Sequence, residues 1–232
     1  MNSSISTLSP EADDVESETP ASRRRRKVRD SIIEAAERVF AEEGLEGLSI
    51  RRLADEIDYS PSAIYKYFTS KTELVGCLKE AFFLRLVRNI EKVVEGNEGC
   101  TDWRVVRDCV KTYVHTALEK PHHYVARFTR SDDDGAEGHV QDNPYVGDSP
   151  SAVAFQFLYE GIEEGVQSGN FRPDLNTQLA SKSIATAMHG LTVCLINMPD
   201  FLLLQPDGSK MSPDDFIDFY ADQLVRGLEA GK

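Results

Sequence analysis

Residues 49–68 read SIRRLADEIDYSPSAIYKYF, a stretch that predicts two short helices joined by a tight turn. Ser49 can cap a first helix that runs to about Ile57 and carries its apolar side chains on one face. Ser60 can cap a second helix, in which Pro61 takes the first position, where a missing backbone N–H has no cost.

The same stretch meets the packing requirements of a helix-turn-helix. A small residue, Ala54, lets the second helix cross the first closely, and Ile64 supplies the apolar contact that holds the crossing angle. We expect the second helix to run to about Tyr67. Glycine is often found in the turn of this motif. Here Asp58 takes that place, and Asp tolerates a left-handed backbone better than most residues.

A longer helix precedes this motif and runs from about Val28 to Glu43. Gly44 follows it, as expected of the left-handed residue that ends a helix. Its apolar residues fall on one helical stripe, namely Ile32, Ile33, Ala36, Val39 and Phe40. The three helices together predict a small domain over residues 22–70.

Residues 27–76 resemble the DNA-binding domain of the tetracycline-repressor (TetR) family. The first helix ends with AAERVFAEEG at 35–44, the next begins with SIRRLA at 49–54, and SPSAIYKYF follows at 60–68. SKTEL at 70–74 completes the pattern in the order that the family has. The resemblance implies that the chain binds double-stranded DNA.

The resemblance also implies which side chains meet the DNA. The family places its third helix in the major groove, where base edges can be read. The residues that would face bases or nearby sugar-phosphate are Pro61, Ser62, Ala63 and Tyr65. Those that would hold phosphates, which fix the register on DNA, are Lys66, Tyr67, Lys71 and Ser49, with Arg51 or Arg52.

Three of these assignments leave an alternative open. Ser49 can act first as a helix cap, and Tyr65 can be partly a core residue. Arg51 and Arg52 are adjacent and point about 100° apart on a helix, so both need not reach the DNA.

The net charge of −13 is unusual for a DNA-binding protein, but the acidic residues are unevenly distributed. Residues 1–21 hold five acids and no base, and residues 22–75 hold eleven Lys and Arg against ten Asp and Glu. Residues 22–75 can therefore place bases on one face. The run RRRRK at 23–27 is either a solubilising segment or an N-terminal arm that contacts phosphates or the minor groove. If it is such an arm, removal of residues 1–26 weakens DNA binding and lowers its salt dependence.

The rest of the chain also has a helical pattern. A long helix is expected from Lys71 to about Glu95, and further helices over about 102–119, 121–130, 149–168, 174–198 and 213–229. Residues 1–21 are predicted to be disordered, 131–149 to form an exposed loop, and QPDG at 205–208 to form a turn. The predicted fold is all-α, with a helix-turn-helix domain at 22–70 and a larger ligand-binding and dimerisation domain at 71–232.

Residues 155–191 extend the resemblance to the ligand domain of one TetR-type subgroup. GNFRPD at 169–174 and AMHGL at 187–191 carry it, although Ala185 stands where that subgroup often has tryptophan. The family's effector pocket lies among the middle helices, and an aromatic lining suits a mostly apolar small molecule. The candidate lining residues, each of which can instead be a core residue, are Tyr113, Phe128, Phe155, Tyr159, Met188 and His189.

The last two long helices carry apolar or small residues on more than one face. In the last helix Phe216, Tyr220 and Leu224 recur at steps of four. In the family these two helices pair with the same two of a second chain as a four-helix bundle, which implies a homodimer. The alternative is that both faces belong to the core of one chain.

No pattern typical of catalysis or metal binding stands out. The histidines are scattered, the acidic run at 132–134 is typical of a solvated loop, and no Gly-rich phosphate loop or nucleophile elbow occurs. The four cysteines lie far apart, which favours reduced thiols in a cytoplasmic protein. They are Cys77, Cys100, Cys109 and Cys194. No run of eighteen apolar residues predicts a membrane span. We therefore expect no enzyme activity, cofactor, metal or membrane partner.

These patterns predict a TetR-like transcriptional regulator, a repressor that binds a palindromic operator as a dimer and is released by a small, mostly apolar effector. Two alternatives remain open. One is a helical small-molecule-binding module without specific DNA binding, which only the acidic net charge favours. The other is an effector-independent activator or architectural DNA binder.

Overall fold

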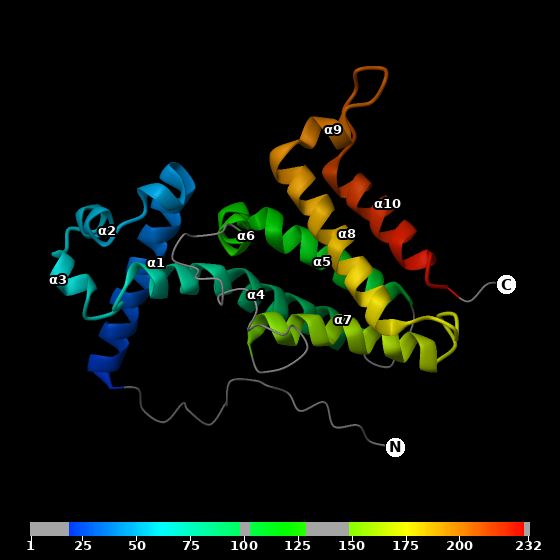
Figure 1. Cartoon of the computed structure of the whole chain (residues 1–232), viewed down its shortest axis with the longest axis horizontal. Coiled ribbons are helices and arrows are strands. Elements are labelled where there is room, and N and C mark those ends of the chain that lie inside the picture. Colours follow the sequence, from blue (N-terminus) through cyan, green and yellow to red (C-terminus); the bar gives the residue numbers. More distant parts are fainter. Residues whose placement is uncertain (1–18, 98–102, 129–148, 230–232) are drawn as a thin grey trace. The chain divides into compact units, whose positions relative to one another are not determined.

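The computed structural model describes residues 19–97, 103–128 and 149–229, which form two compact units divided between Lys71 and Thr72. Both units consist of helices (Figure 1). Within the described residues, β pairing is limited to two isolated bridges, one of them between Phe171 and Glu229. The all-α fold class is therefore confirmed.

Several predictions from the sequence fall outside the described residues. They concern residues 1–18 of the expected N-terminal tail, the expected loop at 131–149 apart from its last residue, the acidic run at 132–134, and Cys100.

The first unit contains α1 (Pro20–Gly47), α2 (Ile50–Glu56) and α3 (Pro61–Ile64). Helix α1 begins earlier than predicted, because Thr19 caps it by accepting a hydrogen bond from the backbone N–H of Ser22. Pro20 at the first position and the arginines that follow are compatible with a helix start. The expectation that residues 20 and 21 belong to a disordered tail is therefore wrong, and the basic run at 23–27 is helical.

Helices α2 and α3 pack as the helix-turn-helix pattern predicts. Ala54 and Ile64 are both fully buried. Asp58 in the turn adopts the left-handed backbone that its position requires, with a φ of 56°. Helix α3 ends at Ile64, and residues 65–67 continue as turns rather than as the last turn of a longer helix.

The second unit contains the predicted long helices and one that was not predicted. The bounds are α4 (Lys71–Gly96), α5 (Trp103–Glu119), α6 (Pro121–Phe128), α7 (Pro150–Gln167), α8 (Thr177–Asn197), α9 (Pro199–Leu203) and α10 (Pro213–Arg226). The unpredicted helix, α9, is too short for its sequence to show a helical period. Helix α8 begins later than expected, because Asn176 caps it by accepting a hydrogen bond from the N–H of Leu179 at 3.0 Å.

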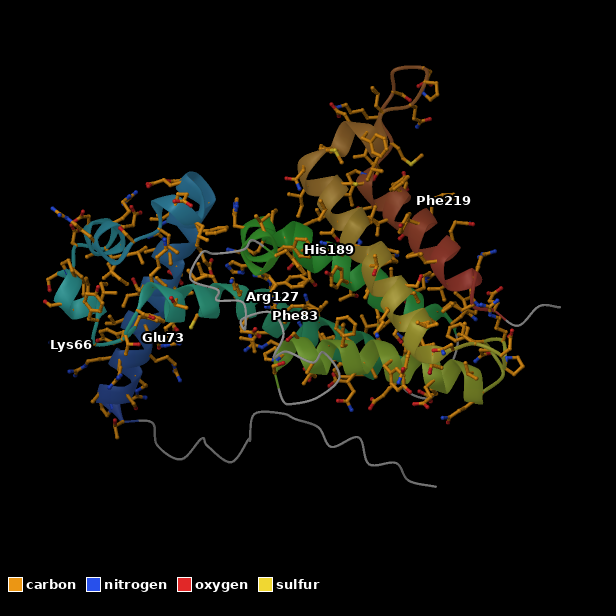
Figure 2. The ribbon with its side chains drawn as sticks, in the orientation of Figure 1. Lys66, Glu73, Phe83, Arg127, His189 and Phe219 are labelled. Atoms are coloured by element: carbon orange, nitrogen blue, oxygen red, sulfur yellow. The ribbon has the colours of Figure 1, made fainter. Side chains whose placement is uncertain are left out.

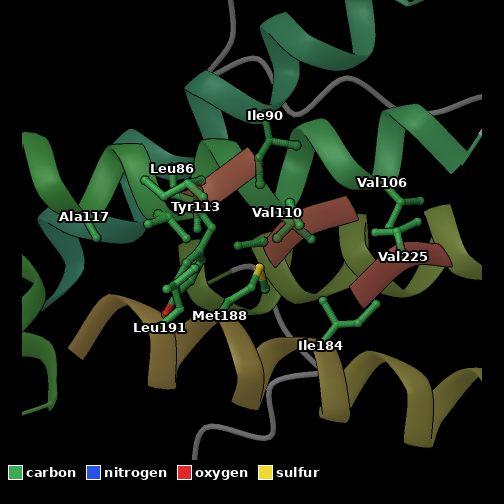
Figure 3. Packing of buried hydrophobic residues seen from close by; sticks show 14 of the residues in the cluster. Leu86, Ile90, Val106, Val110, Tyr113, Ala117, Ile184, Met188, Leu191 and Val225 are labelled. Carbon is green, nitrogen blue, oxygen red and sulfur yellow. The ribbon is translucent and has the colours of Figure 1, made fainter. Parts of the chain in front are cut away.

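The core of the second unit is centred on α5. Helices α8 and α10 both pack against α5, and α7 packs against α8. Figure 3 shows Val110 and Tyr113 of α5 among the side chains of Met188 and Leu191 of α8. Four neighbouring helices thus bring residues far apart in the sequence around one interior.

Helix α8 is the one described helix that is long and apolar enough to cross a membrane by length and composition. The core helix of a soluble protein passes the same test. Ile184, Met188 and Leu191 of α8 belong to the core cluster of the second unit, so packing within the protein accounts for part of this apolar composition.

Candidate DNA interface and effector cavity

Helix α3 presents a small polar surface at its start, where the side chain of Ser60 caps its first turn. The Ser60 hydroxyl accepts a hydrogen bond from the N–H of Ala63 at 3.2 Å, and Ile64 is fully buried. This arrangement leaves Ser62 exposed and Ala63 half-buried. Tyr65 is 54% exposed, so the alternative that it belongs to the core is excluded. Pro61 is also exposed.

Ser49 acts as a helix cap in the structure. Its hydroxyl accepts a hydrogen bond from the backbone N–H of Arg52 at 3.1 Å, and the residue is exposed. A hydroxyl has two acceptor lone pairs and one donor, so the capping bond leaves its O–H able to meet a phosphate. The phosphate role of Ser49 stays a prediction.

Arg51 and Arg52 have different surroundings. Arg52 pairs with Glu56 at 2.8 Å and with Glu43 at 2.9 Å, and its hydrogen bonds to these carboxylates raise its pKa. Arg51 is exposed, and among the described residues it makes no ion pair or side-chain hydrogen bond. Of the two, Arg51 is therefore better placed to bind phosphate.

Arg25 of the basic run and Arg29, one turn later in α1, pack against the end of the helix-turn-helix. The Arg25 guanidinium donates to the backbone oxygen of Lys66 at 3.5 Å and lies 5.9 Å from the centroid of the Tyr67 ring. Arg29 lies 4.9 Å from the centroid of the Phe68 ring. Sequence analysis missed these contacts, although positions four apart share one face once the helix extends to Pro20.

The remaining predicted phosphate ligands differ in exposure. Lys66 is exposed in the turn after α3, where Figure 2 labels it. Tyr67 is half-buried under Arg25. Lys71 is half-buried, and its ammonium donates to the backbone oxygen of Leu45 at 3.0 Å. The exposed residues of this surface are therefore Pro61, Ser62, Tyr65 and Lys66, with Ser49 and Arg51 at the start of α2.

The second unit contains a cavity of about 500 Å³ that is lined by residues of α4, α5, α6, α7 and α8. This volume is within the usual range for small-molecule sites. The cavity brings together five of the six predicted lining residues: Tyr113, Phe128, Phe155, Met188 and His189. Tyr159 is not part of the lining, whereas its neighbour Leu158 is. That these residues bind a ligand stays a prediction.

Sequence analysis missed the wall of the cavity that α4 provides. Phe83, Leu86 and Ile90 line it, and their spacing of three and four is the signal that places them on one face of α4. Arg127 and Lys182 also line the cavity. No local pattern marks these two bases, because each comes from a different helix.

A chain of hydrogen bonds connects the core to the cavity. The Tyr113 hydroxyl donates to the Tyr124 hydroxyl at 3.2 Å, and the Tyr124 hydroxyl lies 2.6 Å from Nδ1 of His189. Burial raises the pKa of Tyr124 to about 12 and lowers the pKa of His189. Because the Tyr124 oxygen accepts from Tyr113, its own hydrogen is available for Nδ1. A neutral His189 ring that accepts this hydrogen at Nδ1 carries its own hydrogen on Nε2.

The titratable groups near the cavity give no sign of a metal centre. Among the described residues, no group of three or more His, Cys, Asp or Glu is placed to hold a metal ion. Cys109 lines the cavity, and burial raises the pKa of its thiol to about 12. A thiol with such a pKa is a poor nucleophile near neutral pH.

Parts of this chain are similar in sequence to known transcriptional regulators. Residues 32–76 match the model of the family described as bacterial regulatory proteins, tetR family. The chain is 26% identical over 153 residues to the transcriptional repressor KstR2 of Rhodococcus jostii, which is 66% of this chain and 72% of that protein. It is 39% identical over 70 residues to the nicotine-responsive repressor HdnoR of Paenarthrobacter nicotinovorans, covering 30% of this chain and 36% of that one.

A solved structure extends the similarity of fold beyond these segments. The regulator PfmR of Thermus thermophilus has a TM-score of 0.61 and 22% identity, over 86% of this chain and 99% of that one. At this identity the likeness concerns the fold.

Proposed function

We propose that this chain, a member of the TetR family of transcriptional regulators, is a repressor that binds a palindromic DNA operator as a homodimer. A small, mostly apolar molecule in the cavity of the second unit would release it from DNA. The relatives KstR2 and HdnoR, which are named transcriptional repressors, support this proposal. The observation that carries it is the exposed surface of α3, held by a helix-turn-helix whose contact residues Ala54 and Ile64 are fully buried.

Base contacts in this proposal come from α3, and phosphate contacts come from its surroundings. Ser62 can exchange hydrogen bonds with a base edge, and the methyl group of Ala63 can touch that of a thymine. Lys66 and Arg51 are exposed cations that can meet phosphates. Arg52 has a structural role instead, because its guanidinium forms ion pairs with both Glu43 and Glu56.

The adjacent pair Arg51 and Arg52 offers a matched test of DNA binding. DNA from upstream of the protein's own gene, labelled for fluorescence anisotropy, is titrated at several salt concentrations with competitor DNA present. R51A is expected to weaken binding and to reduce the slope of log affinity against log salt by about 1.8, because the homodimer loses one phosphate contact in each protomer and each contact contributes about 0.9. R52A is expected to lower the melting temperature and to leave the slope unchanged. No sequence-specific binding by the unaltered chain would contradict the proposed function.

The homodimer would form through α8 and α10. Leu179 of α8 is 64% exposed and Phe219 of α10, labelled in Figure 2, is 59% exposed. Ser183 and Gly190 of α8 are small and exposed, which lets a partner helix approach closely. Dimerisation would place the two α3 helices about 34–36 Å apart, the spacing of successive major grooves on one side of DNA.

Light scattering tests the dimer with a matched pair of charge insertions. F219D is expected to give a monomer at micromolar concentration. L84D places the same charge at an exposed leucine of α4 and is expected to leave the dimer intact. A monomer for the unaltered chain, or the same mass for both variants, would contradict the assignment of this interface.

Coupling between cavity and DNA would run through α4. This helix starts at Lys71, where the first unit ends, and contributes Phe83, Leu86 and Ile90 to the cavity. An effector can shift the protein away from its DNA-binding state only by as much as its affinity for the other state exceeds its affinity for the DNA-binding state. The proposed regulator acts in the cytoplasm and carries out no reaction.

A further inference from the structure

The first turns of α1 form a strongly basic surface of the first unit. Residues 20–29 hold six Lys and Arg and no Asp or Glu, although the chain as a whole has 39 acids against 26 bases. Arg23, Arg24 and Lys27 are exposed, and among the described residues their side chains make no ion pair or hydrogen bond. These three charges are therefore available to an anionic partner.

These turns are a helical extension of the part of α1 that packs in the core. The Thr19 side chain caps them by accepting a hydrogen bond from the N–H of Ser22. The same helix then continues without a break to Ile32 and Ala36, which are fully buried. The bases at 23–27 are therefore held at a fixed place relative to the helix-turn-helix.

The basic turns lie beside the end of the helix-turn-helix. The Arg25 guanidinium donates to the backbone oxygen of Lys66 at 3.5 Å and lies 5.9 Å from the centroid of the Tyr67 ring. Figure 1 shows this dark blue start of α1 next to the chain that follows α3. Lys66 is itself a proposed phosphate ligand, so DNA that meets Lys66 also comes close to the basic turns.

The helical form of the run limits how it can meet DNA. An α-helix with its side chains is about 10–12 Å wide, whereas the minor groove is about 6 Å wide. The run therefore does not fit into the minor groove, where an extended arm would fit. The five consecutive bases at 23–27 are turned by about 100° from one to the next, so they point to every side of the helix. A phosphate backbone on any open side of the helix therefore meets at least one of them.

We propose that the bases at 23–27 bind the DNA backbone beside the groove that α3 occupies, and that they hold phosphates without reading the base sequence. This inference rests on the proposed function, in which α3 lies in the major groove. It adds a second DNA-binding element to the first unit and assigns to it a part of the affinity that does not depend on sequence.

The variant R23Q/R24Q/K27Q tests the proposal. Glutamine forms helices about as well as arginine and lysine do, and the three positions are exposed, so the melting temperature is expected to stay the same. In anisotropy titrations with DNA from upstream of the protein's own gene, the slope of log affinity against log salt is expected to fall by about 1.8 or more, which corresponds to at least one phosphate contact in each protomer of the proposed homodimer. Binding to that DNA and binding to unrelated DNA should weaken by the same factor.

Exposed bases of the second unit provide the control. R88Q/K92Q/R172Q lowers the net charge by the same amount and is expected to leave the slope unchanged. Point variants isolate the bases better than a truncation does, because residues 1–21 also hold five acids that a truncation would remove.

Each of three results would overturn the proposal. An unchanged slope for R23Q/R24Q/K27Q would make the run a solubilising segment. An equal loss of slope in the control variant would assign the effect to net charge alone. A loss of affinity confined to the upstream DNA would show that the run reads bases. The absence of sequence-specific binding by the unaltered chain would instead contradict the proposed function, so the two failures can be told apart.

Discussion

Substitution of Gly165 of α7 by alanine is expected to destabilise the fold. The same substitution at Gly161, one turn earlier in the helix, is expected not to destabilise it. A Cβ at Gly165 would lie 2.3 Å from Cδ2 and 2.5 Å from Cε2 of Phe171. Phe171 is fully buried, and its backbone N–H donates to the Gly165 oxygen at 2.9 Å. A Cβ at Gly161 would meet only Cγ2 of Val106, at an ordinary 3.6 Å.

The two substitutions should therefore change the free energy of unfolding in opposite directions. Carbon atoms prefer a separation of about 3.5–4.0 Å, so G165A requires the buried Phe171 ring to move by roughly 1 Å or more. Overpacking of this kind costs about 1–3 kcal/mol. Replacing a helical glycine by alanine contributes about 0.5–1 kcal/mol of stability. We expect G165A to be less stable by about 1–2 kcal/mol. G161A should be more stable by about 0.5 kcal/mol.

Urea unfolding measures both changes at one fixed protein concentration, because the stability of the proposed homodimer would depend on concentration. The variant F171L provides the control. If the clash with the ring is the cause, G165A should destabilise an F171L background much less than it destabilises the unaltered chain. Equal midpoints for G161A and G165A, or additive effects of G165A and F171L, would refute the reasoning.

Four further predictions concern single groups. S49A removes the cap on the N–H of Arg52 and should lower the free energy of unfolding by about 1 kcal/mol in urea titrations, with S49D close to the unaltered chain. D58A should be less stable than D58G by about 1 kcal/mol in the same assay, because the φ of 56° strains a Cβ that cannot hydrogen-bond locally. Cys109, with a pKa of about 12, should react with iodoacetamide at pH 8 roughly a thousandfold more slowly in the folded than in the urea-unfolded protein, and equal rates by peptide mass spectrometry would contradict its burial. Because burial lowers the pKa of His189, the unfolded chain takes up a proton there at a higher pH than the folded chain does, so stability should fall as the pH drops below 6.5, and H189Q should reduce this slope.

Features that depend on neighbouring residues could be predicted from the sequence. Ser49, Ser60 and Pro61 act within a few positions of themselves, so the start of each short helix follows from local hydrogen bonds. The contact between Ala54 and the following helix depends on a fixed offset of ten residues to Ile64, and both are buried as expected. The long helices follow equally from apolar periodicity.

Features that depend on distant residues were decided by the tertiary structure. Arg51 and Arg52 are alike in sequence, and only the folded position of Glu43 shows which of them is engaged. Arg25 meets Lys66 across 41 positions, and Tyr124 meets His189 across 65. No local pattern determines such pairs, because the packing of whole helices brings them together.

The sequence by itself thus determined an all-α chain with a helix-turn-helix, because capping and periodicity act within one or two turns. The tertiary structure alone placed Arg127 and Lys182 in the lining of one cavity, beside the predicted His189, and left out Tyr159. Which residues line a cavity depends on how several helices are rotated about their axes when they pack. That rotation follows from the summed fit of many side chains, so a single stretch of sequence does not determine it.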